Sequence, residues 1–253
     1  MSSWPNAVTI GSFVSDLDAP GDYRLTTMVE GWGSPARRLT ITPRTGAHGA
    51  YLLGQQWAER TIVHSGLIEC STATVANTIA QELAALAPGV DYAYVVDHEA
   101  IGSLACTVQV ALGPEPEWVD DRSFTYILTL VAPDPFKRAL SPETVSIATG
   151  TSVPFTALGT AAAEIEVTTT SSGTVHVEQG GLAIMASSVP SGTVFTSGPG
   201  FDNLPRSVVG PGGEDLYSLT LPGTQWPAVV PGANSILNQG TAAVQVRYFP
   251  TYA

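Results

Sequence analysis

A change in sequence pattern just beyond the middle of the chain constrains the fold most strongly. Before it, strand-like segments accompany one segment of helical period, whereas beyond Ser141 no helical period remains. Pro133 and Pro135 lie just before the change and end a β-ladder, because proline lacks the backbone N–H and fixes φ. The sequence therefore predicts a mostly β protein (all-β/α+β) with two domains, 1–138 and 139–253.

The first domain is expected to contain one helix among several strands. An apolar stripe at helical spacing predicts the helix and consists of Val75, Ile79, Leu83 and Leu86. Ser71 or Thr72 can cap it, and Pro88-Gly89 ends it. Strands are expected over 23–32, 38–42, 60–68, 92–96, 104–112 and 123–131. In 60–68, alternation places Ile62, His64 and Gly66 on one face, and the acidic, Pro-rich segment 113–121 is expected to be a loop.

The second domain reads as short strands separated by turns. Val-, Thr- and Ile-rich segments alternate with Gly, Pro and Ser, and the expected strands are 144–147, 165–170, 175–179, 182–186, 207–209, 216–221 and 243–248. Ser171-Ser172-Gly173 and Gln179-Gly180-Gly181 are turn signals between them. Short strands at this spacing, each with one apolar face, predict an antiparallel β-sandwich.

The charge balance excludes whole classes of function. The formal net charge is -12, and only 10 residues are Lys or Arg, of which Lys137 is the one lysine. Binding to nucleic acid or to anionic membranes needs clustered positive charge, which is absent from this sequence. No apolar run approaches the ~20 residues of a membrane helix, and the N-terminus lacks the features of a signal peptide. Charged residues make up only 13%, which favours a soluble chain that packs against copies of itself or other subunits.

Residues capable of catalysis or metal binding are scattered. The four histidines are His48, His64, His98 and His176, with no i, i+4 pair among them. His98 lies between Asp97 and Glu99, but sequence neighbours point apart and rarely share a metal. For His64 and His176, within expected strands, a structural role is predicted. The sequence contains no G-x-S-x-G elbow, no phosphate loop followed by lysine and no C-x-x-C.

Three acidic pairs and one Gly-rich run are further candidates for a binding or catalytic site. The pairs are Asp16 and Asp18, Asp120 and Asp121, and Glu214 and Asp215. Each pair could hold Ca²⁺ weakly or serve as acid and base, but solvated loop carboxylates are the commoner case. The run Ser197-Gly198-Pro199-Gly200 carries a proline and opens no helix, so it is interpreted as a turn. We therefore predict no catalytic, cofactor-binding or metal-binding residues, and no enzyme.

Packing in a core or an interface is the simplest role for the tryptophans and cysteines. Trp32, Trp57, Trp118 and Trp226 could form a sugar-stacking platform, but they are spread over both halves, which favours core or interface packing. Cys70 and Cys106 lie in apolar, strand-like sequence and are interpreted as small buried hydrophobes in a reducing compartment. Their spacing alone does not support a disulfide.

The C-terminal segment carries the most specific pattern in the chain. It begins at Trp226-Pro227, continues through Pro231-Gly232 and Asn234 to Ile236, and is followed by Gly240 and the last strand. Pro231-Gly232 makes a tight turn, and Asn234 is expected to tolerate the unusual backbone beyond it. This pattern resembles the end of the distal tail (Dit-like) proteins of bacteriophages with long, non-contractile tails.

Other positions extend the resemblance over nearly the whole chain. The segment from Ala132-Pro133 through Asp134-Pro135-Phe136 to Lys137 is similar to the junction between that family's two domains. Gly49-Ala50, Arg60, the following strand and the helix from Ala73 occur in the family's order. The first twenty residues do not match the pattern.

The resemblance implies a structural virion protein rather than an enzyme. It implies a minor tail protein, made in the host cytoplasm, that forms a hexameric ring at the distal end of a siphophage tail. The N-terminal domains would build the ring wall, and galectin-like C-terminal sandwiches would project from it. The ring would join the tail tube protein to tail-tip or baseplate proteins, and DNA would pass through its lumen without specific binding. The resemblance implies no cofactor and no membrane contact.

A carbohydrate-binding host-adhesion module of the tail tip is the alternative. Such a module would bind sugar on an exposed aromatic platform, and Trp226 is the first candidate for a residue of that platform. A galectin-like fold does not by itself imply sugar binding, because function resides in sites rather than in folds.

Overall fold

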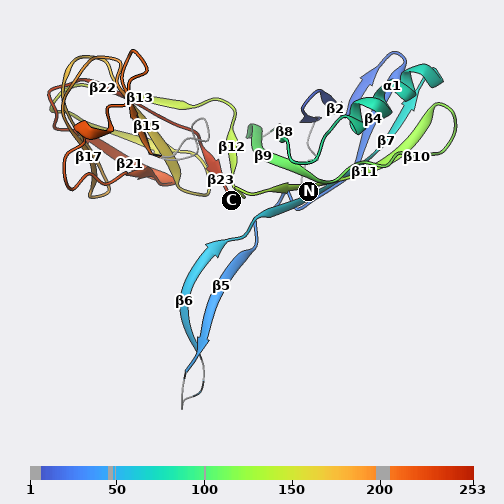
Figure 1. The fold of residues 1–253 in the computed structure, drawn as a ribbon, viewed down its shortest axis with the longest axis horizontal. Coiled ribbons are helices and arrows are strands. Elements are labelled where there is room, and N and C mark those ends of the chain that lie inside the picture. Colours follow the sequence, from blue (N-terminus) through green and yellow to red (C-terminus); the bar gives the residue numbers. More distant parts are fainter. Residues whose placement is uncertain (1–6, 45–47, 49, 100, 198–205) are drawn as a thin grey trace. The chain divides into compact units, whose positions relative to one another are not determined.

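A computed structural model divides the chain into two compact units, Met1–Lys137 with Ala253 and Arg138–Tyr252, called here the first and the second unit (Figure 1). The structure describes residues 7–44, 48, 50–99, 101–197 and 206–253. Among them strands dominate, and the one α-helix, α1 (Ala73–Ala84), belongs to the first unit. The predicted mostly β fold class is confirmed.

An antiparallel sheet forms the body of the first unit. Along it the strands follow the order β2-β1-β8-β9-β11-β7-β4-β3, and the short strand β10 pairs with β11. Their bounds are β1 (Ala7–Ile10), β2 (Phe13–Ser15), β3 (Leu17–Ala19), β4 (Asp22–Glu30), β7 (Arg60–Cys70), β8 (Asp91–His98), β9 (Gly102–Leu112), β10 (Glu117–Trp118) and β11 (Ser123–Ala132).

The core of the first unit lies between one face of this sheet and α1. Burial alternates along β7, so that Ile62, His64 and Gly66 all face inward, as their spacing predicts. Ile79 and Leu83 of α1 pack into the same core. Thr72 is the N-cap, and its hydroxyl accepts a hydrogen bond from the backbone N–H of Val75 at 3.3 Å. The predicted helix and its capping residue are confirmed.

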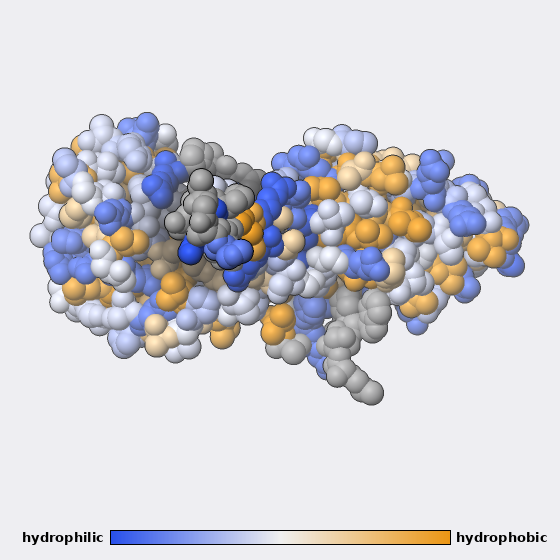
Figure 2. All heavy atoms as spheres, turned by 90° about the horizontal axis from the view of Figure 1, so that it is seen from below, coloured by the Kyte–Doolittle hydropathy of each residue, from blue (hydrophilic) through white to orange (hydrophobic). Residues whose placement is uncertain are grey.

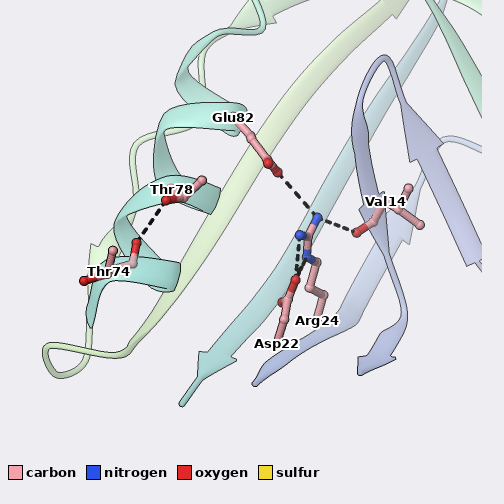
Figure 3. A network of polar contacts seen from close by, with 6 residues as sticks. All are labelled: Val14, Asp22, Arg24, Thr74, Thr78 and Glu82. Carbon is pink, nitrogen blue, oxygen red and sulfur yellow. Dashed lines mark hydrogen bonds and ion pairs between the residues drawn. The ribbon is translucent and has the colours of Figure 1, made fainter. Parts of the chain in front are cut away.

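Arg24 joins three elements at the edge of this core (Figure 3). Its guanidinium forms an ion pair with Asp22 on the same strand, β4, with 2.6 Å between Nη2 and Oδ2. Nη1 donates to the carbonyl of Val14 on β2 at 3.2 Å and lies 3.7 Å from the carboxylate of Glu82 on α1. Because Arg24 is buried, these contacts tie β2, β4 and α1 together at a site with little water.

We expect Arg24→Met to lower the free energy of unfolding by about 1–2 kcal/mol, because it leaves Asp22 and the Val14 carbonyl without their charged donor. Urea unfolding followed by tryptophan fluorescence measures the change. Arg122→Met is the control, since Arg122 pairs with Asp121 on the exposed surface, and exposed pairs contribute less than about 1 kcal/mol. Equal effects of the two substitutions would contradict the proposed tie.

A separate hairpin belongs to the first unit. Strands β5 (Arg37–Pro43) and β6 (Ala50–Trp57) form a two-stranded sheet of their own (Figure 1). The register runs from Arg37 opposite Trp57 to Pro43 opposite Ala50. At the base of the hairpin, the Trp57 ring lies 6.1 Å from that of Phe136 and 4.5 Å from the Arg37 guanidinium. The sequence predicts β5 but misses β6.

The second unit is an antiparallel β-sandwich, as predicted. One sheet has the order β13-β22-β15-β18-β19, with β20 on β15, and the other has the order β14-β21-β16-β17. The strands are β13 (Glu143–Ile147), β14 (Ser152–Ala157), β15 (Ala163–Thr169), β16 (Gly173–Gln179), β17 (Leu182–Val189), β18 (Val194–Thr196), β19 (Ser207–Val209), β20 (Ala228–Val229), β21 (Gly232–Asn238) and β22 (Val244–Tyr248). Short strands β12 (Lys137–Ala139) and β23 (Thr251–Tyr252) pair with each other. Alternating residues of both sheets form one buried core.

One predicted strand is wrong. Segment 216–221 holds a 3₁₀ turn, η1 (Tyr217–Leu219), instead of a strand. Leu216 and Leu219 both pack against the sandwich core. Their i, i+3 spacing matches the three residues per turn of a 3₁₀-helix, which brings both side chains to the same side.

Candidate assembly surface

His64 lies in the closed core of the first unit and has no access to solvent. Its Nε2 is 3.3 Å from Oγ1 of Thr26 and 3.4 Å from the hydroxyl of Tyr126. Burial lowers the pKa of His64 to about 4, so its ring is neutral at pH 7. The His64 ring is fully buried, so no ligand reaches it. This position fits the structural role predicted for His64.

The other histidines lie apart from it. Nε2 of His98 accepts a hydrogen bond from Nε1 of Trp32 at 2.9 Å. His176 lies on β16 opposite Met185, and His48 is exposed. Within the part of the chain that the structure describes, no three His, Cys, Asp or Glu side chains gather as metal ligands would.

In each of the three acidic pairs, at least one carboxylate accepts a hydrogen bond from a backbone N–H. Oδ1 of Asp16, which has a φ of 55°, accepts from the backbone N–H of Thr26 at 2.8 Å. Oδ1 of Asp120 accepts from the N–H of Arg122 at 2.8 Å. In the third pair, Glu214 accepts from the N–H of Gly212, and Asp215 accepts from the N–H of Tyr217, both at 2.9 Å. In the second and third pairs the N–H donor lies two residues away, as is common for acidic residues in loops, whereas Thr26 is ten residues from Asp16.

The Gly-rich run that could be mistaken for a phosphate loop begins at Ser197. Its hydroxyl accepts a hydrogen bond from the backbone N–H of Ile165 at 2.7 Å, inside the second unit. Residues 198–200 of the run lie outside the described residues.

The four described tryptophans are spread over both units and not gathered on one strand face. Trp32 and Trp57 are half-buried in the first unit, and Trp118 packs on Phe124 with ring centroids 5.0 Å apart. Trp226 is half-buried against the core of the sandwich. The packing interpretation therefore accounts for Trp226, the first candidate for a sugar contact.

Neither Cys70 nor Cys106 forms a disulfide. Cys106 is buried in the core of the first unit, as expected for a small hydrophobe. Cys70 ends β7 and is only half-buried, and burial together with the charge of Asp22 raises the pKa of its thiol.

The turn at Pro231-Gly232 works differently from the prediction. Gly232 has a φ of +93°, so glycine rather than Asn234 takes the left-handed backbone. Asn234 lies in β21 and closes the turn with its side chain, donating from Nδ2 to the carbonyls of Val230 at 2.7 Å and Gly232 at 2.8 Å. Its Oδ1 accepts from Nε2 of Gln179 at 2.6 Å. The asparagine acts through hydrogen bonds and not through its own backbone conformation.

A buried cationic cluster holds the end of the first unit around Trp32. Nη2 of Arg60 donates to the carbonyl of Pro135 at 2.7 Å, and Nη1 donates to Gly31 at 2.8 Å and also to Gly33. Nζ of Lys137 donates to the carbonyl of Trp32 at 2.9 Å and lies 5.2 Å from its ring. Burial, with the nearby charge of Arg60 as a smaller cause, lowers the pKa of Lys137 to about 8. The segment that precedes the second unit is thus fixed by two buried cations.

Among the described residues, no helix covers the opposite face of the first unit's sheet. Its outward residues alternate with the buried ones and include Leu25 of β4, directly opposite Leu67 of β7, and Ile127 of β11. Tyr23, Leu25 and Ile127 are exposed apolar side chains. Figure 2 shows hydrophobic residues gathered on the first unit, at the right of the view. Exposed apolar residues on one sheet face are typical of a surface that another protein covers.

A hollow of about 440 Å³ lies at the border of this face. It is lined by Leu112, Gly113, Glu115, Glu117, Thr125, Tyr126 and Ile127. Leu112 and Ile127 are 68% and 59% exposed. The loop that the sequence predicts at 113–121 supplies its two carboxylates, although that segment also contains β10.

No family model matches the sequence, and no curated protein matches it. Solved structures match its fold. The Dit protein of phage SPP1, described as a paradigm of the hub adsorption apparatus in phages that infect Gram-positive bacteria, aligns with a TM-score of 0.69 and 15% identity. The alignment covers 91% of this chain and 94% of the SPP1 protein.

Chains of the phage P2 baseplate in its activated conformation are also similar. The structure with Ca aligns with a TM-score of 0.55 over 96% of this chain and 97% of the baseplate chain, and the structure with Sr aligns with a TM-score of 0.51 over 95% and 97%. Both are 8% identical. The chain therefore has the fold of the Dit hub protein, which confirms at the level of the fold the resemblance that its sequence indicates. No helix among the described residues has the length and hydrophobicity to span a membrane.

Proposed function

We propose that this chain is a structural virion protein that forms a hexameric distal ring in the tail of a siphophage. The first unit builds the ring wall, and the second unit, a galectin-like sandwich, projects from it. The ring joins the tail tube protein to tail-tip or baseplate proteins, and DNA passes through its lumen without specific binding. The protein performs no catalysis in this role.

The fold carries this proposal. A likeness that covers more than nine tenths of both chains includes both units, whereas a shared sandwich alone would fit many unrelated proteins. The uncovered, partly apolar sheet face of the first unit supports it further, because a ring of identical subunits needs a large surface for its repeated contact. The buried groups with shifted pKa, His64 and Tyr126, lie in the closed core, which disfavours catalysis.

We expect the purified protein to form a species of six times 26.3 kDa, about 158 kDa, with a central hole. Light scattering coupled to size exclusion gives the mass, and negative-stain images give the hole. Ile127→Glu is expected to shift the mass toward the monomer, because it places a charge on the uncovered sheet face. Leu158→Glu, at an exposed site in the second unit, is the matched control. A protein that stays monomeric even with tail tube and tail-tip partners would contradict the proposal.

The carbohydrate-binding alternative has a weaker basis. A hollow of about 240 Å³ in the sandwich includes His176, Ser187 and Gln239, which could bind hydroxyl groups. However, none of the described residues that line it is Trp, Tyr or Phe, so it offers no ring on which a sugar stacks. A glycan array with the isolated virion protein tests this alternative, and His176→Ala is the informative variant because Trp226 serves the core.

A further inference from the structure

Strand β5 of the β5–β6 hairpin carries exposed apolar side chains together with basic ones. Leu39 and Ile41 are 52% and 56% exposed, although both are large and apolar. Arg37 is the first residue of the strand and lies on the same face as Leu39 and Ile41. Arg38 lies on the other face, where it pairs with Glu59, and Arg44 follows the strand. Three of the ten basic residues in a chain of net charge -12 thus fall within eight positions. An apolar and basic surface of this kind indicates a partner that is apolar and acidic.

The hollow beside β11 has the matching composition. Leu112 and Ile127 give it exposed apolar walls, Glu115 and Glu117 give it negative charge, and no basic residue is among its described lining. Neither carboxylate has an ion pair among the described residues. Complementary charge around an apolar centre is the usual composition of a specific protein interface.

The strand pairing adds a backbone feature. Strand β10 pairs with β11 at Phe124 and Thr125, and β9 pairs with it from Thr129 onward. Between them, residues 126–128 of β11 are paired on one side only, by β7, in the register of the described strands. The hollow opens at this gap, so an extended segment can lie beside an edge that the chain's own sheet leaves free.

We propose that strand β5 of one copy of this chain docks in the hollow beside β11 of a second copy. Leu39 and Ile41 cover Leu112 and Ile127, while Arg37 and Arg44 lie against Glu115 and Glu117. The contact joins two different surfaces of the same protein, which is the head-to-tail geometry that generates a closed ring when its rotation closes. The inference rests on the proposed homo-oligomer and names the surfaces through which neighbours meet.

Disulfide trapping between two variants tests the contact directly. Ile41→Cys and Ile127→Cys are made separately in a Cys70→Ser background, mixed in equal amounts and oxidised mildly. Mass spectrometry then quantifies the peptide that links position 41 to position 127. We expect at least about tenfold more of it than of the product from Ile41→Cys mixed with Leu158→Cys, since a disulfide forms only between close Cα atoms. Leu158 is exposed in the second unit and controls for random collision.

Charge reversal in the same assay tests the electrostatic part. Replacing Glu115 and Glu117 with Arg in the Ile127→Cys copy is expected to lower the yield of the link about fivefold. Replacing Arg37 and Arg44 with Glu in the Ile41→Cys copy should restore the yield, whereas a change that only disturbed the structure of either copy would not be rescued in this way.

The possible outcomes separate this inference from the proposed function. A 158 kDa ring without the 41–127 link would overturn the docking site and leave the ring standing. A protein that stays monomeric and forms no link, even with tail tube and tail-tip partners added, would overturn both proposals. A link from position 127 only to an added tail partner would assign the hollow to that partner and overturn the inference. The 41–127 link with restoration by charge reversal supports it, whatever mass the free protein has.

Discussion

Replacing Arg60 with methionine is expected to lower the free energy of unfolding by about 3 kcal/mol, because a buried cation with several carbonyl partners is lost. The guanidinium is 2% exposed and donates through Nε and Nη2 to the carbonyl of Pro135, at 2.9 and 2.7 Å. Methionine fills part of the volume but donates no hydrogen bond, which leaves the buried Pro135 carbonyl without a partner. The carbonyls of Gly31 and Gly33 lie in exposed turns, where water replaces the arginine.

The effect should extend to the segment that Arg60 holds. Without the bonds to Pro135, we expect faster proteolytic cleavage within residues 132–137 under native conditions, before global unfolding. Urea unfolding gives the stability change, and limited proteolysis with mass spectrometry gives the site. Arg38→Met is the matched control, because Arg38 pairs with Glu59 at the surface, and its loss should cost less than about 1 kcal/mol. An Arg60→Met protein as stable and as protease-resistant as this control would refute the role of the cluster.

Periodicity predicts the parts of this fold that are buried on one face. The stripe from Val75 to Leu86 indicates α1, and the alternation of Ile62, His64 and Gly66 is enough to place a histidine on the core face of β7. Both patterns are local, because each depends only on how one element faces the core. The change of pattern beyond Ser141 likewise coincides with the first strand of the sandwich, β13.

Periodicity misses elements where pairing violates simple alternation. In β6 the register shifts beside Gly54, so no strict period of two remains in the sequence. Strand β14 contains Pro154, which argues against a strand, yet β14 lies at the edge of its sheet, where proline is tolerated. Segment 216–221 resembles a strand because Leu219 and Leu221 are two residues apart. In the structure, however, Leu216 and Leu219 are three residues apart on a 3₁₀ turn and face the same side.

The candidate surface could not be predicted from local sequence. Segment 113–121 is visibly acidic, but the hollow beside it exists because β9 and β10 leave a gap along β11, which depends on pairing between distant segments. The presence of three arginines, Arg37, Arg38 and Arg44, within eight positions is visible in the sequence. The sequence does not show, however, that Leu39 and Ile41 of the same strand are exposed. Alternation alone would predict that one face of this strand is buried in a core.

Acid is expected to destabilise the first unit through His64 at pH values well above those that titrate ordinary carboxylates. Burial lowers the pKa of His64 to about 4, against about 6.5 in the unfolded chain. Between these values the unfolded state binds more protons, so the contribution of the neutral ring to stability is complete above pH 6.5 and is lost as the pH falls toward 4. From pH 7 to pH 5 the loss from this one residue is about 2 kcal/mol.

The comparison with His64→Gln isolates this residue. Glutamine does not titrate, so this variant should be less stable at pH 7 but should lose about 2 kcal/mol less than the native protein between pH 7 and pH 5. His98, whose pKa is also lowered by burial and by Lys137, contributes equally to both proteins and cancels in the difference. His48→Gln, at an exposed position, should follow the native protein throughout. Urea unfolding at half-unit pH steps gives the curves, and parallel curves for the native protein and His64→Gln would show that the buried ring does not titrate in this range. If this loss is confirmed, acidification lowers the free energy of unfolding of the first unit, which we propose forms the ring wall. The cause would then be a buried core residue and not a change at the subunit interface.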